Sequence, residues 1–213
     1  MGECCDGSGY QKTFGDGFAR RMSRRYHQRG LNRTQQHLVD FLAESGIEGA
    51  TILEIGGGIG EIQVELLRRG ADRATNLEIS ENYEAEATEL LRQTGLEDRV
   101  TRRMHDIATG PDEVPEAAVV VLHRVVCCYP DYPLLLGAAA GHARRLLVFS
   151  HPPRNLLTRT LVGFDNQMRR LRGNDFRSFV HPPAAMVETV RAQGMTQQYR
   201  NHGLSWDVLG FAR

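Results

Sequence analysis

The sequence predicts an α/β fold with a mostly parallel sheet and helices on both of its faces. Apolar, β-branched runs alternate with segments of helical periodicity between residues 50 and 150, which is the first observation. The second is that glycines close the helical segments. The third is a closing pair of strand-like segments after residue 194. Strands that alternate with helices imply right-handed crossovers and a parallel sheet covered on both faces.

The first half of the chain supplies the opening elements in order. Residues from about 11 to 45 are polar and arginine-rich, with Leu38, Phe41 and Leu42 at helical spacing, and predict one or two helices before the core. Strands are then expected at 50–55, 73–79 and 99–107. Between them lie helices at 61–70 and 81–95, closed by Gly70 and Gly95.

The second half continues the alternation and then interrupts it. A strand at 117–126, a helix from about Pro133 and a strand at 144–150 are expected. Residues 151–180 predict a helical insertion with a loop, and a helix follows at 181–194. The chain closes with an antiparallel hairpin around Asn201-His202-Gly203. Residues 1–213 are therefore interpreted as one domain, with a helical extension at 1–45 and an insertion at 151–180.

Composition narrows the classes of partner. With 213 residues, 41% of them hydrophobic, the chain can bury a full core. Its 26 basic and 26 acidic residues balance, so no global field favours nucleic acid. Lys12 is the only lysine, and arginine fills the other basic positions. We expect a monomer or homodimer that acts on a small molecule.

The cellular location and the metal content are predicted from sequence patterns that the chain lacks. No apolar run approaches the roughly 18 residues of a membrane span, and the first ten residues are neither basic nor apolar. A cytoplasmic protein is the prediction. The cysteines form two adjacent pairs, Cys4-Cys5 and Cys127-Cys128, without the spacing of a zinc site, so no metal is expected. Core packing is the favoured interpretation of the second pair, and a thiolate site is the alternative.

A glycine-rich turn, TILEIGGGIGEI at 51–62, joins the first strand to the first core helix. The pyrophosphate-binding pattern G-x-G-x-x-G fails because its last position is Glu61. The pattern that fits is E-x-G-x-G-x-G, formed by Glu54, Gly56, Gly58 and Gly60. Carboxylates on both sides would repel a diphosphate and attract a cation. The turn therefore predicts a positively charged or zwitterionic cofactor.

These features resemble the class I S-adenosylmethionine-dependent methyltransferases. LEIGGGIG is similar to their first motif, NLEIS to the second, HDI to the third and LHRVV to the fourth. The resemblance implies a Rossmann-like, seven-stranded mixed sheet of order 3-2-1-4-5-7-6. It also implies S-adenosyl-L-methionine as the cofactor, with Glu78 on the ribose and Asp106 on the adenine amino group. The cofactor-binding residues it implies are Glu54, Gly56, Gly57, Gly58, Gly60, Glu78, Ile79, Asp106, Ile107 and His123.

Structural roles remain alternatives for some of these residues. Glu78 is also explained as a helix-capping carboxylate, and Asp106 as an ordinary turn residue. Candidate catalytic side chains at the expected carboxyl edge are His123, Tyr129 and His151. Methyl transfer needs a base only if the acceptor carries a proton. A packing role is the alternative for His123.

The charge of the insertion at 151–180 predicts the kind of methyl acceptor. The insertion carries six arginines between 154 and 177, which favours an anionic acceptor held by guanidinium groups, with a solvated helix face as the alternative. Arg154, Arg170 and His181 are the candidate substrate-binding residues. CCYPD and RRLRGNDFRSFVHPPAAM resemble, more weakly, the magnesium-protoporphyrin O-methyltransferase branch, whose acceptor is a carboxylate.

The activity expected from this resemblance is O-methylation of a small, anionic molecule. Tyr10, Phe14, Phe18 and Tyr26 are predicted either to form a lid over the cofactor or to pack the extension on the sheet. Two rival hypotheses remain. One is a catalytically inactive protein that binds the cofactor and serves as a regulatory or partner module. The other is a nicotinamide-dependent oxidoreductase, which the glycine spacing disfavours.

Overall fold

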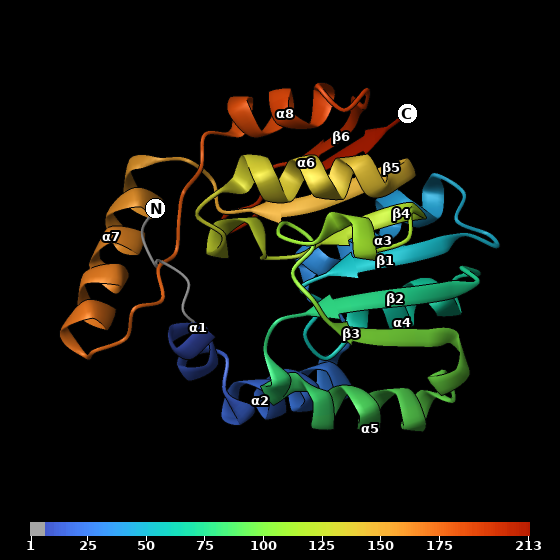
Figure 1. Cartoon of the computed structure of the whole chain (residues 1–213), viewed down its shortest axis with the longest axis horizontal. Coiled ribbons are helices and arrows are strands. Elements are labelled where there is room, and N and C mark those ends of the chain that lie inside the picture. The colour runs from blue at the N-terminus through green and yellow to red at the C-terminus, as the bar shows by residue number, and fades with distance from the viewer. Residues whose placement is uncertain (1–6) are drawn as a thin grey trace.

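The computed structural model describes residues 7–213 and shows a central sheet covered by helices (Figure 1). The pair Cys4-Cys5 lies outside the described residues. The strands are β1 (Thr51–Ile55), β2 (Arg73–Glu78), β3 (Val100–Met104), β4 (Ala117–Leu122), β5 (Ala143–His151), β6 (Thr196–Asn201) and β7 (Asp207–Ala212). Their order is β3-β2-β1-β4-β5-β7-β6, and β7 runs antiparallel to both of its neighbours. The predicted fold class and strand order are confirmed.

The α-helices of the described residues are α1 (Gly7–Thr13), α2 (Asp16–Arg29), α3 (Arg33–Glu44), α4 (Glu61–Arg68), α5 (Glu84–Thr94), α6 (Tyr132–His142), α7 (Leu156–Leu171) and α8 (Pro183–Arg191). The extension holds three helices where one or two were predicted. Gly15 and Gly30 interrupt the helical backbone, and Asn32 starts α3 with a capping box formed with Gln35. Short 3₁₀ turns are η1 (Glu81–Tyr83), η2 (Glu97–Arg99), η3 (Pro111–Glu113) and η4 (Val126–Cys128).

The sheet has two buried faces because its central strands are apolar on both sides. All six residues of β4 are buried. Val119 and Val121 pack in one cluster with residues of α2 to α5, whereas Val120 and Leu122 pack in another with residues of α6 and α8. This alternation is the two-residue period of a strand. Figure 1 shows α6 and α8 on one side of the sheet and α2 and α5 on the other.

Two strands end earlier than predicted. β4 stops at Leu122 rather than at residue 126, because Arg124 adopts a left-handed backbone with φ 61° and η4 follows. β3 stops at Met104, because Asp106 starts a turn in which its carboxylate accepts the N–H of Ala108 over 3.0 Å. His123, Arg124 and Asp106 therefore lie in loops at the carboxyl edge of the sheet.

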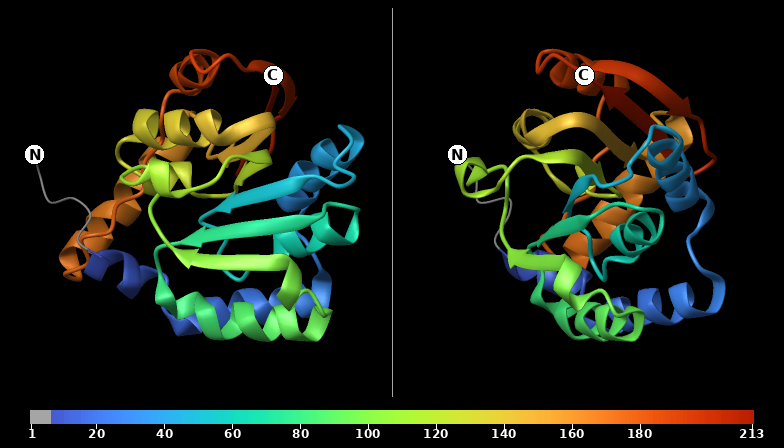
Figure 2. Two further views of the ribbon diagram at one scale, coloured as in Figure 1. Left: turned by 45° about the vertical axis from the view of Figure 1, so that its right-hand side comes forward. Right: turned by 90° about the vertical axis from the view of Figure 1, so that its right-hand side faces the viewer.

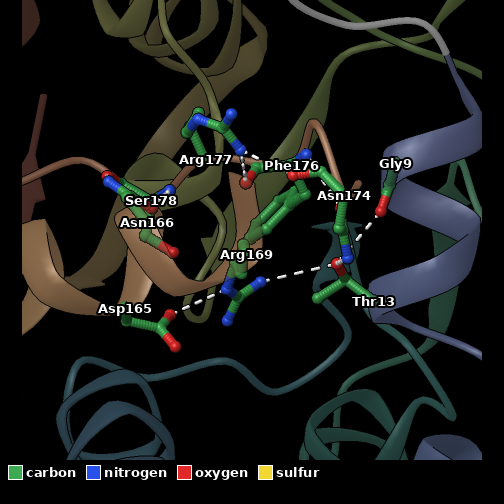
Figure 3. Close-up of polar contacts among 9 residues, drawn as sticks. All are labelled: Gly9, Thr13, Asp165, Asn166, Arg169, Asn174, Phe176, Arg177 and Ser178. Atoms are coloured by element: carbon green, nitrogen blue, oxygen red, sulfur yellow. Dashed lines mark hydrogen bonds and ion pairs between the residues drawn. The ribbon is translucent and has the colours of Figure 1, made fainter. Parts of the chain in front are cut away.

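The insertion forms an outlying arm at this edge. In Figure 1 and in the left-hand view of Figure 2, α7 (orange) stands apart from the sheet. α1 from the other end of the chain lies beside it. Arg169 of α7 donates to Thr13 Oγ1 over 3.4 Å, and Asn174 donates to the same atom over 3.0 Å (Figure 3). No helix in residues 7–213 is long and apolar enough to cross a membrane.

Candidate active site

A cavity of about 440 Å³ opens at the carboxyl ends of β1, β2 and β4. Its floor is the glycine turn after β1, and its walls include Glu54, Glu61 and Glu78. α1 and α2 supply much of the opposite wall, and α3 contributes Gln35. Open α/β sheets bind ligands at this edge. The N-terminal extension therefore lines the cavity, as the lid hypothesis requires, while none of residues 151–180 does so.

The glycine turn needs its bare backbone for two separate reasons. Gly56 and Gly58 have φ 62° and 55°, a region that side chains disfavour. A Cβ on Gly57 would meet the amide of Asn76 and lie 2.9 Å from Cδ of Glu54. Gly60, with φ 86°, precedes α4 and does not line the cavity. Gly56, Gly57 and Gly58 thus present backbone to the cavity, whereas Gly60 shapes the helix start.

Glu78 at the end of β2 is held by backbone donors. Oε2 accepts the N–H of Gly58 over 2.9 Å, and Oε1 accepts those of Ile79 and Ser80 over 2.8 and 3.1 Å. Burial raises the pKa of Glu78, and these three donors oppose that shift. The capping interpretation is wrong, because no side chain caps η1 or α5 and Glu78 is buried rather than on the surface. The same carboxylate also lines the cavity.

Two further carboxylates line the cavity on the side of the glycine turn. Glu54 accepts the N–H of Gln63 over 3.1 Å, and Glu61 accepts Nε2 of Gln35 over 2.6 Å. Burial raises the pKa of both side chains, and neither has an ion pair within residues 7–213. Buried carboxylates that form no ion pair favour a ligand that brings a positively charged group to this side of the cavity.

A narrow slot adjoins the cavity on the side of β2 and β3. Ile79, Ile107 and Leu135 give it apolar walls, and Asp106 and Tyr129 lie at its rim. The Tyr129 hydroxyl donates to Asp106 Oδ2 over 3.0 Å. The free volume of the slot is about 30 Å³, so a planar base would enter only after the walls of the slot had moved apart. The sequence-predicted residues Ile79, Asp106, Ile107 and Tyr129 are brought together here.

His123 follows β4 and lines the cavity. Its Nδ1 lies 2.9 Å from Oγ of Ser150, which already accepts the N–H of Arg124. A hydroxyl has one proton, and Nδ1 is the acceptor that the described residues offer it. His123 is therefore the Nε2–H tautomer. This Nε2 is buried without a hydrogen-bond partner in the described chain, and burial lowers the pKa of His123 to about 3.

Three arginines that the sequence did not single out line the cavity. Arg21 and Arg25 reach it from α2, and Arg124 reaches it from the loop after β4. The guanidinium of Arg124 lies over the ring of Trp206, 4.8 Å from its centroid. In residues 7–213, no carboxylate forms an ion pair with any of the three. The left-handed backbone of Arg124 aims this side chain at the hairpin loop.

The other candidate residues lie elsewhere. His151 is buried at the end of β5, with Nδ1 2.9 Å from the Pro152 carbonyl, and lines neither the cavity nor the slot. Nε2 of His181 lies 3.0 Å from the carbonyl oxygen of Tyr129. Arg154 and Arg170 are exposed on the arm. The structure therefore does not bring the predicted substrate-binding residues to the cavity.

The vicinal thiols show no metal geometry. Sγ of Cys127 and Sγ of Cys128 are 3.7 Å apart, and both donate to the Arg124 carbonyl. No group of three potential metal ligands occurs in the part of the chain that the structure describes. Cys127 is buried and packs beside the loop that carries Arg124, in line with the packing interpretation.

Comparison with known proteins identifies the fold. No family model and no curated protein matches the sequence. Among solved structures, magnesium protoporphyrin IX methyltransferase from Synechocystis PCC 6803 with bound SAH superimposes with a TM-score of 0.76, over 98% of this chain and 100% of that chain, at 18% identity. The fold is that of the class I methyltransferases. The same protein with bound SAM gives a TM-score of 0.67 at 19% identity, over 97% of this chain and 90% of that one.

Other structures with the class I methyltransferase fold show how far the likeness extends. An O-methyltransferase family protein from Burkholderia thailandensis has a TM-score of 0.69 at 19% identity, over 92% of this chain and 59% of that chain. The [4+2]-cyclase SpnF also matches, with a TM-score of 0.63 at 15% identity over 83% of this chain and 80% of its own. A cyclase on the same fold means that the reaction must be argued from the site.

Proposed function

We propose that this protein is an S-adenosylmethionine-dependent methyltransferase that methylates an oxygen atom of a small anionic acceptor. The observation that carries the proposal is the acid-lined glycine turn, in which Gly58 orients Glu78 beside a cavity that also holds Glu54 and Glu61. A sulfonium and an ammonium group suit these carboxylates, whereas a diphosphate does not. Structures of the same fold with bound S-adenosylhomocysteine (SAH) and S-adenosylmethionine (SAM) support the choice of cofactor.

Each part of the cofactor is assigned to different residues of the cavity and the slot. Glu78, which lines the cavity, would accept hydrogen bonds from the ribose hydroxyls, and Asp106, which lines the adjoining slot, would accept one from the adenine amino group. Gly56, Gly57 and Gly58 allow the methionyl part to approach the backbone. Arg21, on the wall opposite the turn, is the guanidinium that we assign to the methionyl carboxylate. When bound, the cofactor supplies a methyl group on a sulfonium, which is already a good electrophile.

The acceptor site that we propose lies at the end of β4. Arg124 and Arg25 provide positive charge, and the Nε2–H of His123 is a buried donor that a ligand oxygen would satisfy. Because Ser150 keeps Nδ1 as an acceptor, His123 orients the nucleophilic oxygen and does not remove a proton from it. This role suits an ionised carboxylate, which has no proton to lose. Trp206 of the β6–β7 loop contacts both groups, with its ring 4.8 Å from the Arg124 guanidinium and 6.3 Å from the His123 ring.

The test uses Arg124→Gln and the control Arg144→Gln, an exposed arginine at the opposite edge of the sheet. Turnover is measured with labelled methyl donor and panels of small carboxylates, phenols and amines. We expect methyl esters from the carboxylate panel. Arg124→Gln should raise the acceptor KM about tenfold or more, with unchanged SAH binding. Methylation of amines alone, or SAH binding without turnover on any panel, would contradict the proposed reaction.

A further inference from the structure

The arm carries a continuous apolar face that nothing in the described chain covers. No residue of α7 is buried. Leu157, Leu161, Phe164 and Leu171 are 69%, 59%, 67% and 71% exposed. Their spacing of three, four and seven residues places them on one side of the helix. Folded monomers seldom expose a contiguous apolar patch of this kind without using it.

The opposite side of α7 is the one attached to the protein. Asn166 exchanges two hydrogen bonds with the backbone of Ser178, over 2.8 and 2.9 Å. The guanidinium of Arg169 lies over the ring of Phe176, 4.9 Å from its centroid (Figure 3). The backbone N–H of Phe179, the residue after Ser178, donates to the Cys127 carbonyl over 2.7 Å. The segment 174–179 therefore lies between α7 and the body, and the apolar face is directed outward.

Positive charge is concentrated on the same arm. Five arginines and one acidic residue, Asp165, occur between 154 and 172, although the whole chain is balanced. Asp165 is paired with Arg169 over 2.7 Å. The remaining four are exposed and have no ion pair within residues 7–213: Arg154, Arg159, Arg170 and Arg172. Arg159 and Arg170 lie on the polar side of α7, opposite the apolar face. A helix with leucine and phenylalanine on one face and uncompensated arginines on the other is typical of helices that lie in a membrane interface.

We propose that α7 docks on the surface of an anionic phospholipid bilayer, with its leucine and phenylalanine side chains in the headgroup–acyl boundary. Its 16 residues extend about 24 Å, which is too short to span the roughly 30 Å hydrocarbon core. A second copy of the chain is a poorer occupant, because it would leave the four unpaired arginines of the arm uncompensated, whereas an anionic surface attracts them. The surface does not depend on the proposed methyl transfer.

The rest of the same edge is compatible with this orientation. Outside α7, the large apolar side chains that are exposed in the described chain are Ile79, Met104, Leu134 and Leu204. They follow β2, end β3, open α6 and lie in the β6–β7 loop, which are all positions at the carboxyl edge. The cavity opens at this edge too. Docking through α7 would therefore bring the cavity close to the bilayer.

Vesicle flotation with the full chain tests the proposal. We expect binding to vesicles of equal parts phosphatidylcholine and phosphatidylglycerol, no binding to phosphatidylcholine alone, and release near 1 M salt, where the screening length is about 3 Å. The triple variant Leu157→Gln, Leu161→Gln and Phe164→Gln should bind at least tenfold more weakly. It should keep the thermal midpoint of the original, because these side chains are exposed.

Charge variants provide the matched control. Arg159→Gln with Arg170→Gln should weaken binding to the anionic vesicles about 25-fold, since each basic residue near such a surface contributes about fivefold. Arg73→Gln with Arg191→Gln removes as much charge at the opposite edge and should change nothing. Binding that is equal for all variants would overturn the proposal. So would light scattering that shows a dimer which the triple variant dissociates, because a second copy would then be the occupant.

Discussion

The backbone N–H of Gly58 donates to Oε2 of Glu78 across 2.9 Å, so the turn after β1 and the last residue of β2 are fixed relative to each other. This contact joins the glycine-rich turn to the carboxylate that we assign to the ribose. Glu78→Gln replaces one anionic acceptor with a neutral amide while keeping the shape. Because hydrogen bonds to charged groups are worth about 1.5–3 kcal/mol, SAH affinity should fall roughly tenfold to hundredfold. Calorimetric titration measures it.

The control for this substitution is Glu89→Gln on the exposed face of α5, where the carboxylate pairs only with neighbouring residues of the same helix. It should leave SAH affinity unchanged. If Glu78→Gln also bound SAH as tightly as the original protein, the assignment of Glu78 to the ribose would be wrong.

Gly57→Ala tests whether the turn tolerates a side chain. The new Cβ would collide with the buried amide of Asn76 and the carboxylate of Glu54, so the free energy of unfolding should fall by about 1–3 kcal/mol. Gly137→Ala is the matched control, since its Cβ meets nothing within 4 Å and it lies inside α6. That change should stabilise the protein by about 0.5–1 kcal/mol. Denaturant unfolding distinguishes the two, and equal effects would contradict the packing described for the turn.

His123→Gln should change the pH dependence of stability. The folded pKa of about 3 lies below the ordinary value of 6.5, so the unfolded state takes up the proton first as the pH falls. Stability that is fully present above about pH 6.5 is then lost progressively towards pH 3, at up to about 1.4 kcal/mol per pH unit. The variant should lack this component when unfolding is followed at a series of pH values between 6.5 and 4.

Burial also lowers the pKa of His151 and raises that of Glu61, so the comparison needs a matched substitution. His27→Gln, on the exposed side of α2, should keep the original slope. A slope for His123→Gln that is indistinguishable from the original would mean that His123 is not held neutral by burial.

Tyr129→Phe separates cofactor binding from chemistry. Its hydroxyl donates to Asp106 in the slot, so we expect SAH affinity to fall about threefold to tenfold as Asp106 loses its partner. Single-turnover rates at saturating cofactor should not change, because Tyr129 lines the slot and not the cavity that His123 and Arg124 line. Tyr132→Phe on α6 is the control and should affect neither quantity. A large fall in the single-turnover rate would restore Tyr129 as a catalytic candidate.

Much of the fold could be predicted because each local pattern agrees with its surroundings. In an α/β chain, the all-apolar run of β4 predicts a strand buried on both faces, and the glycine run predicts the turn between β1 and α4. The division of the extension into three helices was missed, since Gly15, Gly30 and Asn32 act through backbone geometry and capping that periodicity does not report.

The acceptor side was predicted less well for a different reason. Arginine fills all basic positions but Lys12, so the number of arginines in a segment says little about which of them meets a cavity. The insertion was favoured on its six arginines, but Arg154, which precedes α7, and Arg170, which lies on α7, are exposed to solvent. Arg124 was missed although it adjoins His123, because a left-handed arginine leaves no mark in a sequence. Arg21 and Arg25 reach the cavity only through the packing of α2.

The most direct test of the central claim is isothermal titration of the full chain with S-adenosylmethionine, SAH and oxidised nicotinamide dinucleotide. The account predicts one site with micromolar or tighter affinity for the first two, weakened by Glu78→Gln, and no heat with the dinucleotide. Binding of the dinucleotide with no response to either adenosyl compound would contradict it.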